Sequence, residues 1–268
     1  MIDQILMEIV EEQSNEQDLA VLLSGGIDSI SVAFAAHRLG KTLHCYTMYV
    51  DDVVSKDAQN AINTAKEFGW NITVIDVPTD NIANDFKHLV KHFNCRKKTQ
   101  LECTWPFLYV YPNIKQKELL TGWGADGWYG VSKRACMHFK EPKEKFDEFR
   151  MSYFSAPNPV GVRQQEQLCK EYGIKFIAPY FDKRVEDYMM QFDWYEMNRP
   201  IQKVKVVNAF PEFKRTKVRR HENLQLAAKV PDKFEKLLDN PEINLYNRTR
   251  VIDLVRDWSN VGDTLFEI

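Results

Sequence analysis

The sequence predicts an α/β fold in which an open, mainly parallel sheet carries helices on both faces. Two observations predict it. Short apolar runs alternate with segments of helical spacing over the first half of the chain, and glycines end several of them. The chain has 268 residues, 44% hydrophobic and 28% charged, enough for one large α/β domain, alone or with a small helical annex.

The first strand is expected over residues 19–23, an apolar run that ends at a pair of glycines. A helix follows over 28–39, because apolar residues recur at helical spacing and Gly40 is a typical stop. Further strands are expected over 43–50, 72–77 and 119–121, and further helices over 55–68 and 80–93. This alternation is typical of successive βαβ units, which give parallel strands.

Beyond about residue 131 helical patterns dominate, and prolines separate them. Helices are expected over 162–172, 183–192, 201–210 and 232–238, with one short strand over 175–177. We therefore expect an α/β core over residues 1–130 and a mostly helical part over 131–268. No low-complexity linker separates the two parts, so they are expected to form one compact unit without a sharp boundary.

Charge and composition narrow the class of protein. The formal net charge of −2 gives no global attraction to nucleic acid or to an anionic membrane. No apolar run approaches the roughly 20 residues that span a bilayer, and residues 1–4 lack the features of a secretion signal. The five cysteines form no CxxC pair, which is typical of reduced thiols. A cytoplasmic protein without a membrane partner is therefore expected.

Residues 24–29, with the sequence SGGIDS, join the first expected strand to the first expected helix. The glycines let backbone N–H groups approach phosphate oxygens, and the helix N-terminus adds partial positive charge. Ser24 and Ser29 can donate hydrogen bonds to the same oxygens. A carboxylate at Asp28 suits this place only if Mg²⁺ bridges it to the phosphates. The string lacks the features of a Walker loop or a dinucleotide site, and it favours an ATP site over an ordinary capped turn.

SGGIDS resembles the pyrophosphate loop (PP-loop) of the N-type ATP pyrophosphatases. The resemblance implies the adenine nucleotide alpha hydrolase-like fold, an ATP-binding core within residues 1–130, and cleavage of ATP into AMP and pyrophosphate. It also implies that adenine lies against the main chain around Leu22 and residues 46–49. The nucleotide-binding residues implied in this part of the chain are Leu22, Ser24, Gly25, Gly26, Asp28, Ser29 and Tyr46.

Residues 119–126, about 100 residues after the first loop, resemble the Leu-Leu-x-Gly-Glu-Gly-Ala-Asp-Glu string of the asparagine synthetases. The segment reads as a strand that ends in glycines, so it belongs at the same edge of the sheet as the first loop. This adds Thr121, Gly122, Trp123 and Asp126 to the expected nucleotide site. Asp126 is expected to face Asp28 and to supply a second carboxylate for Mg²⁺.

Weaker matches extend the resemblance over roughly residues 19–238. Residues 178–182 resemble the family's Val-Pro-Phe-Leu-Asp segment, and Arg215-Thr216-Lys217 resembles a later Arg-Pro-Lys. Residues 201–210 resemble the stretch that carries an active-site lysine near the α-phosphate. The resemblance therefore implies a catalytic lysine, with Lys203 as the first choice and Lys205 as the alternative.

The chain also departs from the asparagine synthetases. Ile2 follows Met1 where a glutaminase half would expose its cysteine nucleophile, so free ammonia, a separate glutaminase or an amine substrate is expected to supply nitrogen. Trp123 replaces a glutamate, and an indole N–H cannot act as a general acid or base near neutral pH. Gly127 replaces a second glutamate, and Lys175 stands near a position that is acidic in many relatives. Asparagine synthesis itself is not expected.

The predicted function is ATP-dependent adenylation of a carboxyl or carbonyl group, followed by attack of ammonia or an amine. Two alternatives stay open: a PP-loop enzyme that modifies a nucleic-acid base, and a non-catalytic ATP- or AMP-binding module. The basic stretch 214–220 has two interpretations as well: a patch that faces phosphate or RNA, or a solvated or closing segment over the ATP site. The second is favoured by its place in the family pattern.

Overall fold

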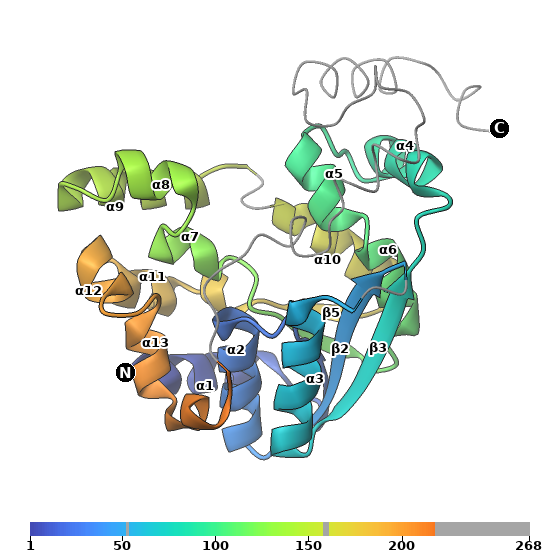
Figure 1. The fold of residues 1–268 in the computed structure, drawn as a ribbon, viewed down its shortest axis with the longest axis horizontal. Helices are drawn as coiled ribbons and strands as arrows, with labels where there is room; N and C mark the ends of the chain where they lie inside the picture. The colour runs from blue at the N-terminus through green and yellow to red at the C-terminus, as the bar shows by residue number, and fades with distance from the viewer. Residues whose placement is uncertain (52–53, 158–160, 218–268) are drawn as a thin grey trace.

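A five-stranded parallel sheet forms the centre of the molecule, in the order β3-β2-β1-β4-β5 (Figure 1). The structure is a computed structural model, and it describes residues 1–51, 54–157 and 161–217. The strands are β1 (Asp18–Leu22), β2 (Thr42–Val50), β3 (Asn71–Val77), β4 (Glu118–Leu120) and β5 (Lys175–Ile177). The predicted fold class is confirmed.

Helices precede, connect and follow these strands. In chain order they are α1 (Ile2–Gln13), α2 (Ile27–Arg38), α3 (Lys56–Phe68), α4 (Ile82–His92), α5 (Lys98–Thr104), α6 (Phe107–Val110), α7 (Ala125–Tyr129), α8 (Lys133–His138), α9 (Lys143–Phe154), α10 (Val162–Glu171), α11 (Lys183–Met189), α12 (Trp194–Asn198) and α13 (Val204–Ala209). Short 3₁₀ helices lie at η1 (Tyr111–Asn113), η3 (Pro179–Phe181) and η4 (Pro211–Arg215). The expected helix over 232–238 lies outside the described residues.

Side chains of β1 alternate between two separate apolar layers. Leu19 and Val21 pack with residues of α1, α2 and α13, whereas Ala20 packs with residues of α4, α6 and α10. Successive side chains of a strand point to opposite faces, so both faces of the sheet are covered by helices. Burial on both faces explains why β1 is almost continuously apolar in sequence.

Helix α1 was not among the expected elements. It is amphipathic, and its buried side chains include Ile2, Leu6, Ile9 and Val10. The helix packs against α2, α11 and α13. Helix α1 thereby connects α2, which follows the first strand, with two helices of the second half of the chain. Among the described residues, no helix is both long and apolar enough to cross a membrane.

The strand order places a switch point between β1 and β4. From β1 the chain continues outward through β2 and β3 on one side, and β4 and β5 extend the sheet on the other side. The loops that follow β1 and β4 therefore meet at the carboxyl edge of the sheet, where open α/β sheets bind their ligands. Because β5 pairs with β4, residues beyond 131 complete the same sheet. The division near residue 130 stays a prediction.

Candidate functional site

The loop after β1 is packed tightly on α3. Gly25 has a φ of +75°, and a β-carbon at this position would lie 2.4 Å from the carbonyl oxygen of Asp57. A residue with a side chain would therefore be strained and would collide with the helix. The glycine allows the loop to turn directly over α3 and to begin α2 at Ile27.

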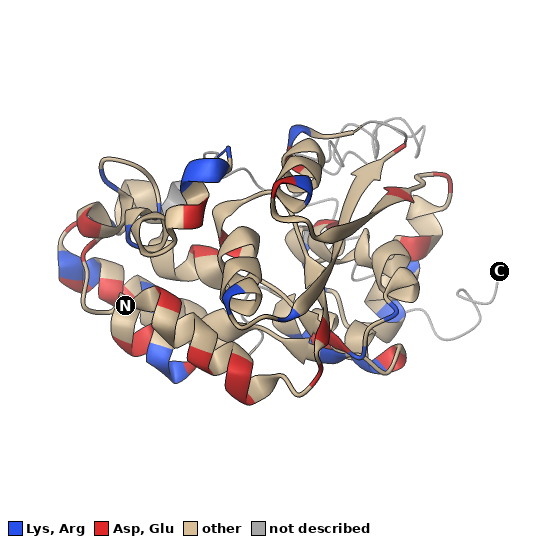
Figure 2. Cartoon of the chain, turned by 90° about the horizontal axis from the view of Figure 1, so that it is seen from below, with Lys and Arg blue, Asp and Glu red and all other residues tan. Residues whose placement is uncertain are grey.

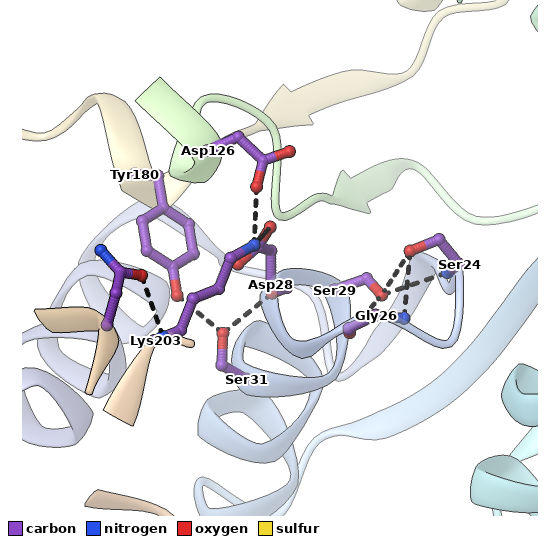
Figure 3. A network of polar contacts seen from close by, with 9 residues as sticks. Ser24, Gly26, Asp28, Ser29, Ser31, Asp126, Tyr180 and Lys203 are labelled. Atoms are coloured by element: carbon purple, nitrogen blue, oxygen red, sulfur yellow. Dashed lines mark hydrogen bonds and ion pairs between the residues drawn. The ribbon is translucent and has the colours of Figure 1, made fainter. Parts of the chain in front are cut away.

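Two serine hydroxyls lie close together where this loop leads into α2 (Figure 3). The Oγ atoms of Ser24 and Ser29 are 3.1 Å apart, and the Ser29 Oγ also accepts a hydrogen bond from the backbone N–H of Ser24. The backbone N–H of Gly26 donates to the Ser24 Oγ over 3.3 Å. Hydroxyl and N–H donors thus gather at the N-terminus of α2, where the first turn of a helix favours an anion.

The loop after β4 lies in direct contact with the first loop. A β-carbon on Gly122 would lie 2.5 Å from the carbonyl carbon of Asp28 and 2.7 Å from the backbone nitrogen of Ser29. Only glycine allows the two loops to approach this closely. Thr121 is buried, and its Oγ1 accepts a hydrogen bond from the backbone N–H of Trp123. The two sequence motifs therefore form one site, as their positions at the ends of neighbouring strands predicted.

Lys203 joins the two loops electrostatically. Its Nζ lies 2.5 Å from a carboxylate oxygen of Asp28 and 2.6 Å from one of Asp126 (Figure 3). The lysine side chain is buried, and its Nζ lies 5.1 Å from the centre of the Tyr129 ring. Below, these three residues are called the Asp28–Asp126–Lys203 cluster. Its formal charge is −1, because two carboxylates share one ammonium group.

The backbone holds Lys203 in a conformation that is rare for a residue with a side chain. Its φ is +60°, and it caps the N-terminus of α13. The backbone N–H of Lys203 donates a hydrogen bond to Asn198 Oδ1, and the Asn198 side chain also donates to the carbonyl of Tyr129. A strained backbone conformation of this kind persists only where its surroundings fix it, and such conformations gather at functional sites.

Burial changes the proton affinity of Asp28. The pKa of its carboxyl group is raised to about 7, because burial disfavours the charged form and Asp126 adds repulsion, which together outweigh the attraction of Lys203. The same two carboxylates raise the pKa of Lys203, although burial opposes them. Near neutral pH the lysine is therefore the stable positive charge of the cluster.

The carboxylates suit Mg²⁺ in number and in chemistry. Asp28 Oδ1 is buried and has no hydrogen-bond partner among the described residues. This oxygen is therefore still able to accept a hydrogen bond or to bind a cation. The described residues contain no group of three or more His, Cys, Asp or Glu side chains that could hold a metal ion. Mg²⁺ is commonly bound by one or two carboxylates together with substrate phosphates, so a cage of protein ligands is not required.

A family model described as asparagine synthase matches residues 1–160, which contain both loops. This chain belongs to the asparagine synthase family. Membership of this family supports the general chemistry of the protein. It binds ATP and is an enzyme of the ATP pyrophosphatase type that carries out ATP-dependent adenylation.

Two further comparisons add little to the family assignment. A solved structure described as a predicted subunit of tRNA methyltransferase from Methanocaldococcus jannaschii is similar to this chain, with 17% identity and a TM-score of 0.36. The match covers 65% of this chain and 75% of the other. A likeness of this size carries no conclusion about function. The comparison with curated proteins found no match.

Three other expected residues of this asparagine synthase family member, Lys205, Leu22 and Tyr46, have contacts outside the cluster. Lys205 places its Nζ 4.2 Å from the centre of the Phe192 ring. Leu22 and Tyr46 are paired in the sheet, and the Tyr46 hydroxyl donates to Gln116, so the phenol belongs to the core. Of the two candidate lysines, only Lys203 contacts Asp28 and Asp126.

Two departures from the asparagine synthetase pattern have packing partners. The Trp123 ring contacts Phe107 of α6 edge-on, with the ring centres 5.8 Å apart. A β-carbon on Gly127 would lie 2.4 Å from the ring of Tyr153 in α9. The space that a glutamate side chain would need at position 127 is thus taken by an aromatic ring. The changes at the second motif are therefore linked to the aromatic residues of the helices around it.

Several residues of the site were not predicted from the sequence. Tyr180 hydrogen-bonds through its hydroxyl to Ser31 over 2.8 Å, and the Ser31 Oγ donates to the carbonyl of Asp28. Asn60 donates from α3 to the carbonyl of Gly25. Tyr180 lies within the segment 178–182 that resembles the family, which was its one sequence signal. Asn60 has no motif around it.

The described part of the basic stretch is held against α3. The Arg215 side chain donates to Glu67 over 2.8 Å and covers the ring of Phe68 at 4.5 Å. Arg219 and Arg220 lie outside the described residues. Figure 2 shows Lys and Arg interspersed with Asp and Glu along the described helices. Arg215 thus has a partner within the protein, which agrees better with a packed segment than with an RNA-facing patch.

Proposed function

We propose that this protein uses ATP to adenylate a carboxyl or carbonyl group and then transfers the activated carbon to ammonia or another amine. An oxygen of the acceptor attacks the α-phosphorus of ATP, and the bond between the α-phosphorus and the bridging oxygen breaks. Pyrophosphate leaves. The amine nitrogen then attacks the adenylated carbon, AMP leaves with the acceptor oxygen, and the nitrogen loses a proton. For a carboxylic acid the product is an amide.

The observation that supports this reaction most directly is the Asp28–Asp126–Lys203 cluster. The two carboxylates come from neighbouring strand ends, and the lysine ammonium lies within 2.6 Å of each. An anion cradle formed by Ser24, Ser29 and the first turn of α2 lies beside the cluster. A triphosphate needs such donors along its length and positive charge where its bond breaks.

The residues of the site have distinct roles in this scheme. The loop amides and the hydroxyls of Ser24 and Ser29 bind the leaving pyrophosphate. Lys203 balances negative charge as the bond to the α-phosphorus breaks. Asp28 and Asp126 would hold Mg²⁺, which when bound supplies positive charge that neutralises the leaving pyrophosphate. Trp123 has no role in proton transfer, because an indole N–H only donates.

The test compares pyrophosphate release by the wild-type protein, Asp28→Ala and Asp18→Ala, with ATP, Mg²⁺ and a panel of carboxylic acids. Asp18 is exposed at the opposite end of β1, so its variant controls for the loss of a carboxylate from the same strand. Hydroxylamine serves as the amine, because it converts acyl adenylates into hydroxamates. Wild type and Asp18→Ala should release pyrophosphate and form hydroxamate together, whereas Asp28→Ala should lose at least a hundredfold in rate.

Near-normal release by Asp28→Ala would contradict the scheme. Pyrophosphate release without hydroxamate on any acid would retain the ATP chemistry and reject the carboxylate acceptor. Calorimetric titration with ATP and Mg²⁺ shows separately whether each variant still binds nucleotide.

A further inference from the structure

Asn60 connects the pyrophosphate loop to the last part of the chain that the structure describes. The side chain is 2% exposed in the middle of α3. Its Nδ2 donates to the carbonyl of Gly25 in the loop and, over 3.1 Å, to the carbonyl of Lys217. One amide group therefore joins two backbone segments that are far apart in sequence. None of the sequence motifs includes it.

The chemistry of the partners requires an amide at this position. Both partners are carbonyl oxygens, which only accept hydrogen bonds, and an amide NH₂ has two hydrogens to donate. An aspartate has nearly the same shape but is acceptor-only when ionised, so it would place a carboxylate against two acceptors. The pair of bonds therefore depends on the nitrogen of Asn60 and cannot be replaced by shape alone.

The segment that ends at Lys217 follows α3 toward the loop. Arg215 binds Glu67 near the C-terminal end of the helix, and Lys217 reaches Asn60 about two turns closer to its N-terminus. Gly25 rests on the same part of α3, since a β-carbon there would lie 3.0 Å from the Asn60 β-carbon. The loop and the segment 211–217 thus both pack on α3 and both bind Asn60.

We propose that Asn60 is a positioning residue that couples the pyrophosphate loop to the segment 211–217. Anion binding at the loop and docking of this segment along α3 then stabilise each other through the shared amide. Such coupling is reciprocal, because two events that favour the same arrangement favour one another equally. The inference rests on the proposed function, since it takes the loop to bind pyrophosphate.

The test uses inorganic pyrophosphate with Mg²⁺ as the ligand and compares wild type with Asn60→Asp, Asn60→Ala and Asn63→Asp. Asn63 is exposed on the same helix, so Asn63→Asp adds the same charge without removing the shared amide. Asn60→Ala removes the donors without adding charge. Both Asn60 variants should bind pyrophosphate about tenfold more weakly by calorimetry, the size expected for about 1.4 kcal/mol of lost hydrogen bonding.

Hydrogen exchange provides a readout that a purely structural role would not change. In wild type and Asn63→Asp, pyrophosphate should slow amide exchange in residues 24–29 and also in 211–217. In the Asn60 variants, saturating pyrophosphate should slow exchange only in residues 24–29. Protection of both segments in Asn60→Ala would overturn the proposal, as would normal affinity in that variant.

The wild-type protein alone also tests the coupling, in case an Asn60 variant fails to fold. Protection of 24–29 without protection of 211–217 in wild type would overturn it while leaving the proposed function intact. A wild-type protein that binds neither pyrophosphate nor ATP would instead contradict the proposed function itself, and with it the basis of the coupling. The two failures are therefore distinguishable.

Discussion

The ammonium group of Lys203 lies 2.5 Å from the carboxylate of Asp28, although 175 positions separate the two residues in the chain. The contact requires α13 to pack against α1 and α2, so a helix of the second half of the chain brings the positive charge to the first loop. The site is therefore assembled from both halves of the molecule.

Replacing Lys203 by methionine should destabilise the protein and abolish adenylation. The change leaves two carboxylates facing each other without a cation, and removing one partner of a buried ion pair costs about 3 kcal/mol or more. Lys205→Met is the matched control, since that ammonium lies over the Phe192 ring and should cost about 1 kcal/mol or less. Urea unfolding measures both values. Equal losses in the two variants would contradict the assignment of Lys203 to the site.

Stability should carry a pH dependence that comes from Asp28. The pKa of its carboxyl is about 7 in the folded protein, above the unfolded value of 3.8, so the folded state binds more protons between these values. The contribution of Asp28 to stability is therefore full at low pH and is lost as the pH rises through about 7.

Asp28→Asn imitates the protonated group and removes this dependence. Relative to wild type, its free energy of unfolding should rise by about 2–3 kcal/mol between pH 5 and pH 8, because nearly two pKa units of the shift lie within this range. Urea unfolding of both proteins at each pH provides the measurement, and the difference cancels contributions from other carboxyls. A constant difference across the range would show that the pKa of Asp28 is not raised.

Gly122→Ala should separate the two loops. The added β-carbon would collide with the backbone of Asp28, and overpacking of this kind costs about 1–3 kcal/mol. Gly69→Ala is a useful control, because Gly69 has a positive φ but its β-carbon would meet open space. Both variants should lose stability in thermal unfolding, but only Gly122→Ala should also weaken ATP binding. Unchanged ATP binding in Gly122→Ala would mean that the contact of the loops is unimportant for the nucleotide.

Trp123→Phe should retain ATP cleavage to within about threefold. The smaller ring still contacts Phe107, and no proton transfer is lost, because an indole N–H cannot serve as a general acid or base. Trp123→Ala should lose the aromatic contact and about 2 kcal/mol of stability, less than a fully buried tryptophan would lose. Measurement of pyrophosphate release alongside thermal unfolding separates the two effects. A loss of a hundredfold or more in Trp123→Phe would indicate a direct role of the indole N–H.

The sheet and the place of the site could be predicted because their signals are local. Apolar runs that end in glycines mark β1 and β4, and parallel strands bring their carboxyl ends to one edge. That geometry brings Asp28 and Asp126 together as expected. The cation between them is the Lys203 ammonium, and the expected Mg²⁺ stays a prediction. The strand β5 was also expected, although only three residues long.

Contacts that depend on tertiary packing could not be predicted. Lys203 contacts Asp28 and Asp126 from a left-handed backbone conformation that no sequence pattern predicts, whereas Lys205 lies over the ring of Phe192. Asn60 lies on a helix whose sequence pattern does not single it out. Its two hydrogen bonds, to the carbonyls of Gly25 and Lys217, are visible only in the folded structure. The roles of these residues stay predictions.

The switch point between β1 and β4 has a consequence for how this protein could change. About forty residues between β3 and β4, including α4, α5 and α6, leave the sheet on one side and return on the other. This excursion contributes Phe107 beside Trp123 but none of the three charged groups. Its buried side chains, such as Phe86 and Trp105, must still cover one face of the sheet, but its exposed residues can vary while the charged groups keep their spacing. Substitutions near Phe107 could thus reshape the surroundings of Trp123 without moving Asp28, Asp126 or Lys203.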